Sequence, residues 1–143
     1  MQKLKVEAIV HASISKVWKH RNDPESIKCW AFASDTWECP YAENDLKVGG
    51  RFLTRMSAKD KSVSFYFTGT YTEVIEFRKI KYKMDKSKNG EKNREREVTF
   101  IDLGNGSTKV EEEFDPEHIN SMDLQKNGWQ AILDNFKKFV ETN

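Results

Sequence analysis

Apolar and polar residues alternate along much of the chain. The alternation is most regular over residues 79–85, where Ile80, Tyr82 and Met84 stand between charged residues, and it recurs over residues 4–10. Because successive side chains of a strand point to opposite faces, this period of two predicts strands that bury one face. Further strands are predicted over residues 52–56, 63–71, 95–103 and 108–114.

Turn signals separate the predicted strands. Residues 86–93 predict a charged hairpin loop, and Asn105-Gly106 is a strong signal for a second hairpin. Val48-Gly49-Gly50 predicts a tight turn into the next strand. Pro40 lacks the N–H that a central strand needs, so we expect any strand within residues 31–46 to lie at a sheet edge.

Helical patterns occupy two parts of the chain. Ser13 is a suitable N-cap for one short helix, and Asp23-Pro24 begins a second that ends near Trp30. From about Ser121 the apolar period becomes helical, which predicts a long C-terminal helix of about 20 residues. Its apolar stripe consists of Trp129, Ile132, Leu133, Phe136 and Val140.

The order of these elements predicts an α+β fold. One strand, two short helices and about six antiparallel strands precede the long helix. That helix must bury its apolar stripe, and the only partner large enough is the concave face of the sheet. The whole chain, residues 1–143, is expected to form a single domain.

Composition narrows the possible functions. The 143 residues have 33% charged residues but a net charge of only +1, so nucleic acid and anionic membrane surfaces are not favoured as partners. No apolar run has the length of a signal peptide or membrane helix, so we expect a cytoplasmic protein with reduced cysteines. We expect a monomer or homodimer, since an edge strand near Pro40 could pair with a second copy.

Several motifs recur in an order and spacing that are known from one superfamily. They are Val17-Trp18, Asn22-Asp23-Pro24, Trp30, Asp45-Leu46-x-Val48-Gly49-Gly50-Arg51-Phe52, Phe67-x-Gly69-x-Tyr71 and Gly128-Trp129-x-x-Ile132-Leu133-x-x-Phe136. With these motifs the chain resembles the START-like (SRPBCC) superfamily, and most of all the branch named after the activator of the heat-shock protein 90 ATPase.

The resemblance covers residues 17–136 and implies a helix-grip fold. In that fold a curved antiparallel sheet of about six or seven strands wraps around the C-terminal helix, with a hydrophobic cavity between them. The superfamily includes ligand transporters, cyclases and hydrolases, so the resemblance does not choose among these functions. The ATPase activator has a further N-terminal domain, and its co-chaperone activity is not carried over to this chain.

Metal and nucleophile chemistry have little support in the sequence. His11, His20 and His118 stand in no metal-binding frame, and Cys29 and Cys39 do not complete a zinc site, so we expect no metal and no cofactor. Cys29 with His20 permits a nucleophilic pair, but a small buried thiol beside Trp30 is the favoured interpretation.

Glu112 is the most informative polar residue. It shares a strand face with Val110 and Phe114, so an inward Glu112 needs a partner. A two-residue turn at Asn105-Gly106 would set Thr99 opposite Glu112. A four-residue loop or a bulge would set Val98 opposite it, with Arg96 one step away on the same face, and this register is slightly preferred. The alternatives are an outward side chain or a structural ion pair.

A group of aromatic and long side chains is expected to line the cavity. On the C-terminal helix, Gln125 lies one turn before Trp129 on the inward face, and Gly128 leaves either ligand space or, slightly preferred, close packing against a sheet aromatic. The candidate ligand-binding residues are Trp30, Trp37, Phe52, Phe67, Tyr71, Tyr82, Met84, Arg96, Glu112, Gln125 and Trp129, with Met122 as a further lining residue.

Three functions remain open at this stage. The first is binding of a small apolar or aromatic molecule through an opening between the short helices, the Trp37 loop and the start of the long helix. The second is a polyketide-cyclase-like or hydrolase-like enzyme with Glu112 as its catalytic carboxylate, assisted by Arg96 or Tyr71. The third is a chaperone-associated interaction domain, which predicts an exposed apolar patch and a filled interior.

Overall fold

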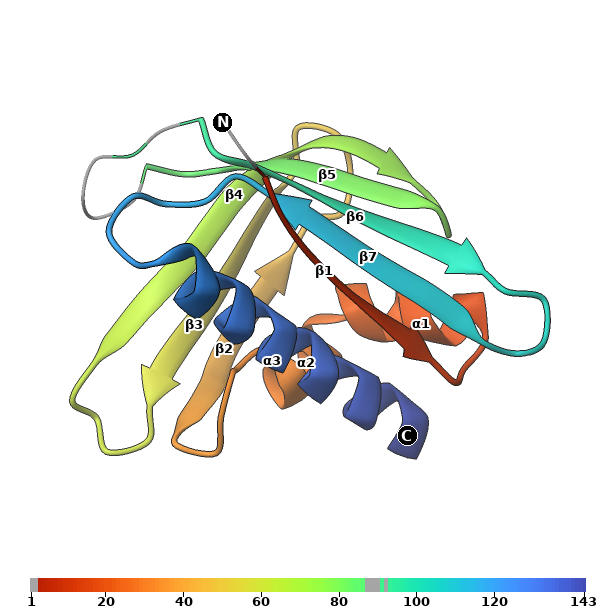
Figure 1. Cartoon of the computed structure of the whole chain (residues 1–143), viewed down its shortest axis with the longest axis horizontal. Coiled ribbons are helices and arrows are strands. Elements are labelled where there is room, and N and C mark those ends of the chain that lie inside the picture. The colour runs from red at the N-terminus through yellow and green to blue at the C-terminus, as the bar shows by residue number, and fades with distance from the viewer. Residues whose placement is uncertain (1–2, 87–90, 92) are drawn as a thin grey trace.

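A single curved sheet and one long helix dominate the molecule. The computed structural model describes residues 3–86, 91 and 93–143. All strand pairs are antiparallel, and the seven-stranded sheet has the order β1-β7-β6-β5-β4-β3-β2. The long helix α3 crosses the concave face of the sheet (Figure 1), which confirms the predicted α+β helix-grip architecture.

The observed elements follow the predicted order. The strands are β1 (Leu4–Val10), β2 (Trp37–Asn44), β3 (Arg51–Ala58), β4 (Ser64–Ile75), β5 (Lys79–Met84), β6 (Glu95–Asp102) and β7 (Thr108–Phe114). The helices are α1 (Ile14–Asn22), α2 (Pro24–Trp30) and α3 (Met122–Thr142). The predicted loop 86–93 lies mostly outside the described residues.

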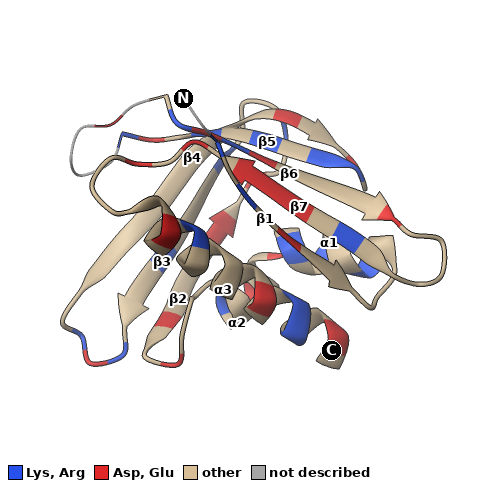
Figure 2. Ribbon diagram, in the orientation of Figure 1, with Lys and Arg blue, Asp and Glu red and all other residues tan. Residues whose placement is uncertain are grey.

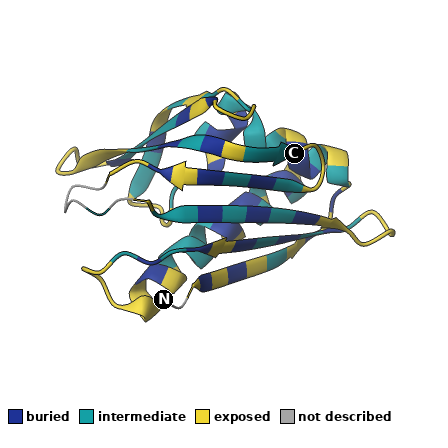
Figure 3. Cartoon of the chain, turned by 90° about the horizontal axis from the view of Figure 1, so that it is seen from above, coloured by how far each residue is buried: buried dark blue, intermediate teal, exposed yellow. Residues whose placement is uncertain are grey.

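The apolar periodicity sorts side chains between core and surface. Figure 3 shows buried and less buried residues alternating along the central strands. The inward side chains of β1, β5, β6 and β7 include Val6, Ile80, Val98, Val110 and Phe114, each at most 1% exposed. Leu133, Phe136 and Val140 of α3 close this core from the concave side.

Each helix begins at a capping residue, and the sequence predicts two of the three caps, Ser13 and Asp23. The side chain of Ser13 accepts a hydrogen bond from the backbone N–H of Lys16, and that of Ser121 accepts one from Leu124. Asp23 caps α2, with Pro24 at its first position. These caps satisfy backbone donors that have no partner within the helix.

The edge strand β1 is tied to α3 by side-chain donors. Gln130 donates to the carbonyl of Glu7 at 3.1 Å, and Lys137 Nζ donates to the carbonyl of Ile9 at 2.6 Å. Unpaired backbone groups at a sheet edge invite association with other chains, and these two bonds cover part of that edge. They also hold α3 close to β1, on one side of the concave face.

The hairpin between β6 and β7 adopts the preferred register with a different loop. Phe100 lies opposite Val110 and Val98 opposite Glu112. Neither predicted loop length, two residues or four, is correct, because five residues connect Asp102 to Thr108. Gly104 and Gly106 both adopt positive φ, a conformation that glycine reaches without steric cost.

Charged residues of both signs are distributed over the outer surface. Figure 2 shows Lys and Arg interspersed with Asp and Glu along the strands and helices. Several surface pairs link neighbouring strands, such as Lys79 with Glu97 at 3.0 Å. Of the helices in the described part of the chain, none is both long and apolar enough to cross a membrane.

Candidate functional site

Two adjoining hollows lie between the sheet and α3. The inner cavity has a volume of about 60 Å³ and is lined by residues of β2 to β7, the short helices and α3. The outer groove has a volume of about 840 Å³ and lies beside the first half of α3. Met56, Phe67, Trp129 and Ile132 line both hollows, so they form the boundary between them.

Aromatic rings from adjacent strands form one wall of the inner cavity. The ring of Phe52 on β3 lies 4.6 Å from that of Tyr82 on β5 and 5.5 Å from that of Tyr71 on β4, measured between centroids. Gly69 is paired with Phe52, and a Cβ there would come within 2.7 Å of the Phe52 ring and 2.5 Å of the carbonyl oxygen of Lys83. A glycine at this position therefore lets the Phe52 ring lie against the sheet.

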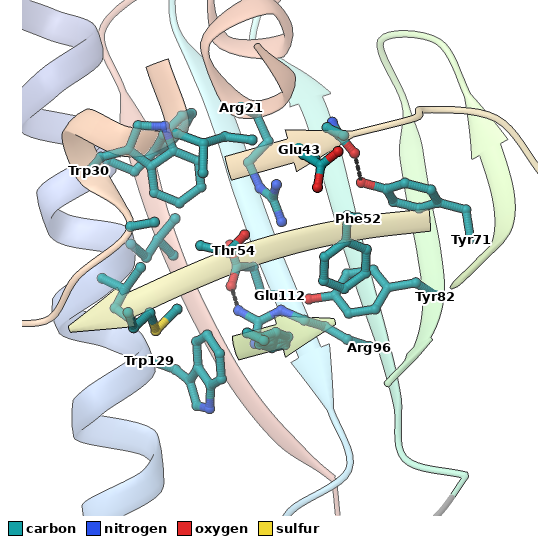
Figure 4. Close-up of a pocket in the computed structure, with 18 residues that line it drawn as sticks. Arg21, Trp30, Glu43, Phe52, Thr54, Tyr71, Tyr82, Arg96, Glu112 and Trp129 are labelled. Atoms are coloured by element: carbon teal, nitrogen blue, oxygen red, sulfur yellow. Dashed lines mark hydrogen bonds and ion pairs between the residues drawn. The ribbon is translucent and has the colours of Figure 1, made fainter. Parts of the chain in front are cut away.

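Arg96 and Glu112 form a buried ion pair at the floor of the inner cavity. They come from adjacent strands, β6 and β7, and their side chains are only 3% and 7% exposed. Figure 4 shows the Glu112 carboxylate facing the Arg96 guanidinium, to whose Nη2 it is bonded. A structural ion pair is one of the alternatives that the sequence analysis gave for Glu112. The pair also provides a partner for a carboxylate that would be costly to bury alone.

Aromatic rings hold the Arg96 guanidinium in place. Its central carbon lies 4.0 Å from the centroid of the Trp129 ring and 5.0 Å from that of Phe114. Such contacts attract a cation to the negative face of an aromatic ring. Burial lowers the pKa of Arg96 from its ordinary value to about 10, so the side chain stays protonated at neutral pH.

Two donor atoms of the Arg96 guanidinium group are unpaired within the described part of the chain. Among the described residues, its buried Nε and Nη1 atoms have no hydrogen-bond partner. Figure 4 shows the Tyr82 hydroxyl pointing toward the same region. An unmatched buried donor carries a desolvation cost, so these atoms make the floor of the cavity suited to an acceptor.

A second polar region lies on the opposite side of the inner cavity. Arg21 of α1 reaches it across the Trp30 ring, at 5.3 Å from the centroid, and Glu43 of β2 lines the same region. The Tyr71 hydroxyl donates to Asn44 Oδ1. Burial raises the pKa of Tyr71 far above its ordinary value, so its phenol is neutral over the physiological range.

The outer groove is mainly apolar and opens at the surface. Trp37 and Phe65 stand on one wall, with their ring centroids 5.9 Å apart. Its rim carries three large apolar residues, Tyr66, Ile119 and Leu124, which are 58%, 70% and 60% exposed. Exposed apolar side chains gathered around a concave surface are typical of binding sites.

Gln125 shapes the groove through backbone contacts. Its amide oxygen accepts from the N–H of Glu117 at 2.8 Å, and its amide nitrogen donates to the carbonyls of Glu117 and Asn120 at 3.1 and 2.9 Å. These bonds attach the segment before α3 to the first turn of the helix. Gln125 therefore lies at the inward position that the sequence predicts, and its hydrogen bonds fix one wall of the groove.

Two expectations about the C-terminal helix are wrong. A Cβ at Gly128 would meet nothing within 4 Å, so this glycine is not explained by close packing against a sheet aromatic, and it instead borders the outer groove. Met122 lines neither hollow and is 37% exposed.

The mouth of the site also differs from the expected one. The Trp37 loop and the start of α3 line the groove as predicted, but its remaining wall comes from β3, β4 and β5 rather than from the short helices. The hydrogen bonds from α3 to β1 place the helix toward that edge, so the gap lies on the side of β3 to β5.

The predicted site residues divide between the two hollows. Those that line the inner cavity are Trp30, Phe52, Phe67, Tyr71, Tyr82, Arg96, Glu112 and Trp129. Those that line the outer groove are Trp37, Phe67, Met84, Gln125 and Trp129. Sequence reasoning did not single out Arg21, Glu43 or Asn44. One signal could have identified Arg21. It lies one helical turn after Val17, and the sequence predicts that Val17 and Trp18 point inward.

Neither interpretation of Cys29 holds. The thiol is exposed and lies 3.4 Å from the carbonyl oxygen of Glu25, so it is not a buried side chain. The imidazole of His20 is 2.8 Å from Ser26 Oγ, so Ser26 is its hydrogen-bond partner. Among the described residues no three His, Cys, Asp or Glu side chains are grouped as a metal site would require.

Comparison with known proteins identifies the relatives of the chain. The family model described as activator of Hsp90 ATPase homolog 1-like protein matches residues 11–141. Among curated proteins, no sequence matches the chain.

Solved structures extend this comparison over nearly the whole chain. An AHSA1-like protein from Aeromonas hydrophila is 41% identical with a TM-score of 0.88, and the match covers 99% of this chain and 93% of that one. Chr148 from Cytophaga hutchinsonii is 44% identical with a TM-score of 0.81 and the same coverage of 99% and 93%. Protein NE0264 from Nitrosomonas europaea is 18% identical with a TM-score of 0.80, over 98% and 94% of the two chains, and shows the shared fold.

Proposed function

The chain belongs to the activator of Hsp90 ATPase homolog 1-like family, within the START-like (SRPBCC) superfamily, and from that premise we propose that it binds a small apolar or aromatic molecule. The ligand would lie between the sheet and α3, with its apolar body in the outer groove. A cytoplasmic location and a monomeric or homodimeric state are part of the same proposal.

The observation that carries this proposal is the size and lining of the outer groove. Ligand pockets commonly have volumes of roughly 300–1,000 Å³ and mainly apolar walls with few polar groups. At about 840 Å³ the groove is within that range. Its walls include Trp37, Phe65 and Met84, and the charged residues among its lining are Asp85, Lys86, Arg94 and Glu117.

The ion pair weakens the case for an enzyme that uses Glu112. A general acid or base has to exchange a proton with the substrate, and its pKa is tuned for that task. The Glu112 carboxylate is instead bonded to a guanidinium that stays protonated. This arrangement favours a structural and electrostatic role for Glu112 over a catalytic one.

The outer groove also bears on the interaction-domain alternative. That alternative requires a filled interior, whereas the space between α3 and β3 to β5 is hollow. The exposed residues Tyr66, Ile119 and Leu124 would fit a partner surface, but they form the rim of this hollow. Their position supports entry of a small molecule more directly than docking of a protein.

A groove-filling substitution tests the proposal. Gly128→Leu places an isobutyl group at the edge of the outer groove, where a Cβ meets nothing within 4 Å. We expect it to weaken binding of the neutral fluorescent probe N-phenyl-1-naphthylamine at least about tenfold. The methylene and methyl groups of the added side chain take space in the groove, so the probe loses apolar contact there. The helix itself should become more stable, since glycine is a poor helix former.

Asn127→Leu is the matched control for this test. It adds the same side chain to the same helix at an exposed position that borders neither hollow. Probe affinity should then stay within about twofold of the unmodified protein, because no apolar contact in the groove is changed. Equal affinities for all three proteins would place the probe elsewhere, and failure of the unmodified protein to bind it would count against the proposal. Native mass spectrometry of freshly purified protein would give the mass of any retained natural ligand.

A further inference from the structure

We infer that the inner cavity receives a carbonyl oxygen of the ligand, which accepts hydrogen bonds from Arg96 while the apolar body of the ligand lies in the outer groove. This inference rests on the proposed function and specifies the chemical class of the ligand. The ligand is an uncharged aromatic or apolar molecule that carries a ketone or amide carbonyl at one end.

The volumes of the two hollows indicate which part of the ligand each of them can hold. Pockets that hold a whole ligand commonly have volumes of roughly 300–1,000 Å³. The inner cavity, at about 60 Å³, therefore admits a small polar group but not the body of a ligand, whereas the outer groove has about 840 Å³. Met56, at their boundary, has an unbranched side chain that adapts readily to a neighbouring group.

The donors at the floor of the inner cavity specify an acceptor. Arg96 is 97% buried, and its Nε and Nη1 atoms have no hydrogen-bond partner among the described residues. Arginine has donors only, so a group that matches these atoms has to be an acceptor. The Trp129 ring, with its centroid 4.0 Å from the central carbon of the guanidinium, packs against this group and restricts its movement.

The charges around the inner cavity favour a neutral acceptor over a carboxylate. Four charged side chains line this cavity, and the two that are buried, Arg96 and Glu112, have opposite formal charges that cancel. Arg96 is already bonded to the Glu112 carboxylate. A ligand carboxylate would bring a second anion beside Glu112 and leave one negative charge unbalanced in a buried site, which is unfavourable. A carbonyl oxygen accepts the same hydrogen bonds without adding charge.

Three probes with one aromatic body test this inference. They are 2-acetylnaphthalene, its planar isostere 2-isopropenylnaphthalene, and 2-naphthoate, which differ only in the head group. Their affinities are measured by isothermal titration calorimetry on the unmodified protein and on the double variant Arg96→Met/Glu112→Met. The two methionines remove the ion pair at similar side-chain length, and such replacements are commonly tolerated.

The inference predicts a change in the ratio of two affinities. The affinity of the ketone relative to the isopropenyl compound should fall at least about tenfold in the double variant, because hydrogen bonds to a charged donor are lost. On the unmodified protein, 2-naphthoate should bind more weakly than the ketone. An unchanged ratio, with both neutral probes still bound, would overturn this inference but leave the proposed function intact.

The other outcomes are equally distinct. Tighter binding of 2-naphthoate than of the ketone would overturn the neutral class in favour of an anionic ligand. If none of the three probes binds the unmodified protein, the proposed function fails and this inference fails with it.

An infrared measurement on the unmodified protein keeps the test independent of the variant. The stretching band of carbonyl-¹³C-labelled 2-acetylnaphthalene should shift to lower frequency on binding, relative to the ketone in a hydrocarbon solvent, because its oxygen accepts a charged hydrogen bond. A band at the hydrocarbon position would overturn the inference.

Discussion

Replacing Arg96 by methionine should lower the free energy of unfolding by about 3–5 kcal/mol, because removing one partner of a buried ion pair leaves the other charge uncompensated. The Arg96 and Glu112 side chains are 3% and 7% exposed, so water does not replace the lost partner. The substitution also removes the contact of the guanidinium with the Trp129 ring. Urea denaturation monitored by circular dichroism measures the effect.

The double variant Arg96→Met/Glu112→Met is the control for this prediction. When both charges are removed together, neither is left unpaired, and apolar replacements of a buried pair are often neutral or stabilising. We therefore expect its free energy of unfolding to return to within about 1–2 kcal/mol of the unmodified protein. If the double variant were as unstable as the sum of the two single variants, Arg96 and Glu112 would be acting independently, contrary to the observed pair.

The second large effect is expected for Phe136→Ala, which should cost about 3–5 kcal/mol of stability. Phe136 is 1% exposed on the inward face of α3, and its ring makes an edge contact with Trp30 at 4.9 Å between centroids. The shortened side chain leaves a void that joins the inner cavity, because Phe136 lines that cavity. Chemical denaturation reports the loss directly.

Phe139→Ala makes the same change on the same helix at a less buried position. The Phe139 ring packs against His20 at 5.2 Å between centroids and is only partly buried. Its loss should therefore be smaller, about 1–2 kcal/mol, because less apolar surface leaves a packed environment. A cost for Phe139→Ala equal to or above that for Phe136→Ala would show that the core is not centred between α3 and the sheet as described.

The sequence predicted the fold well because the fold depends on local signals. Period-two patterns located the strands, and Ser13, Asp23 and Ser121 marked where the helices begin. The pairing of Val98 with Glu112 followed from the need to bury Val98 and Phe100 together. The length of the loop between them did not follow, because it depends on two glycines at positive φ rather than on the Asn-Gly pair alone.

The site was predicted less completely because its polar groups meet through tertiary contacts. Arg96 and Glu112 lie on neighbouring strands, so their proximity could be inferred from the register. Arg21 comes from a short helix and Glu43 from an edge strand, and no pattern in the sequence relates the two. The same limit explains Gly128 and Met122, whose surroundings depend on where α3 lies relative to the sheet.

The four tryptophans of the chain offer the most direct test of the central claim, that a small apolar molecule binds between α3 and the sheet. Each indole N–H gives its own peak in a ¹⁵N–¹H NMR spectrum. Trp37 and Trp129 line the outer groove, whereas Trp18 lines neither hollow and packs against Phe77 and Phe100.

The decisive measurement is a titration of the labelled protein with 2-acetylnaphthalene, followed through these indole peaks. The account predicts progressive shifts of the Trp37 and Trp129 peaks and a stationary Trp18 peak. Saturable binding that moves Trp18 and leaves Trp129 in place would contradict it.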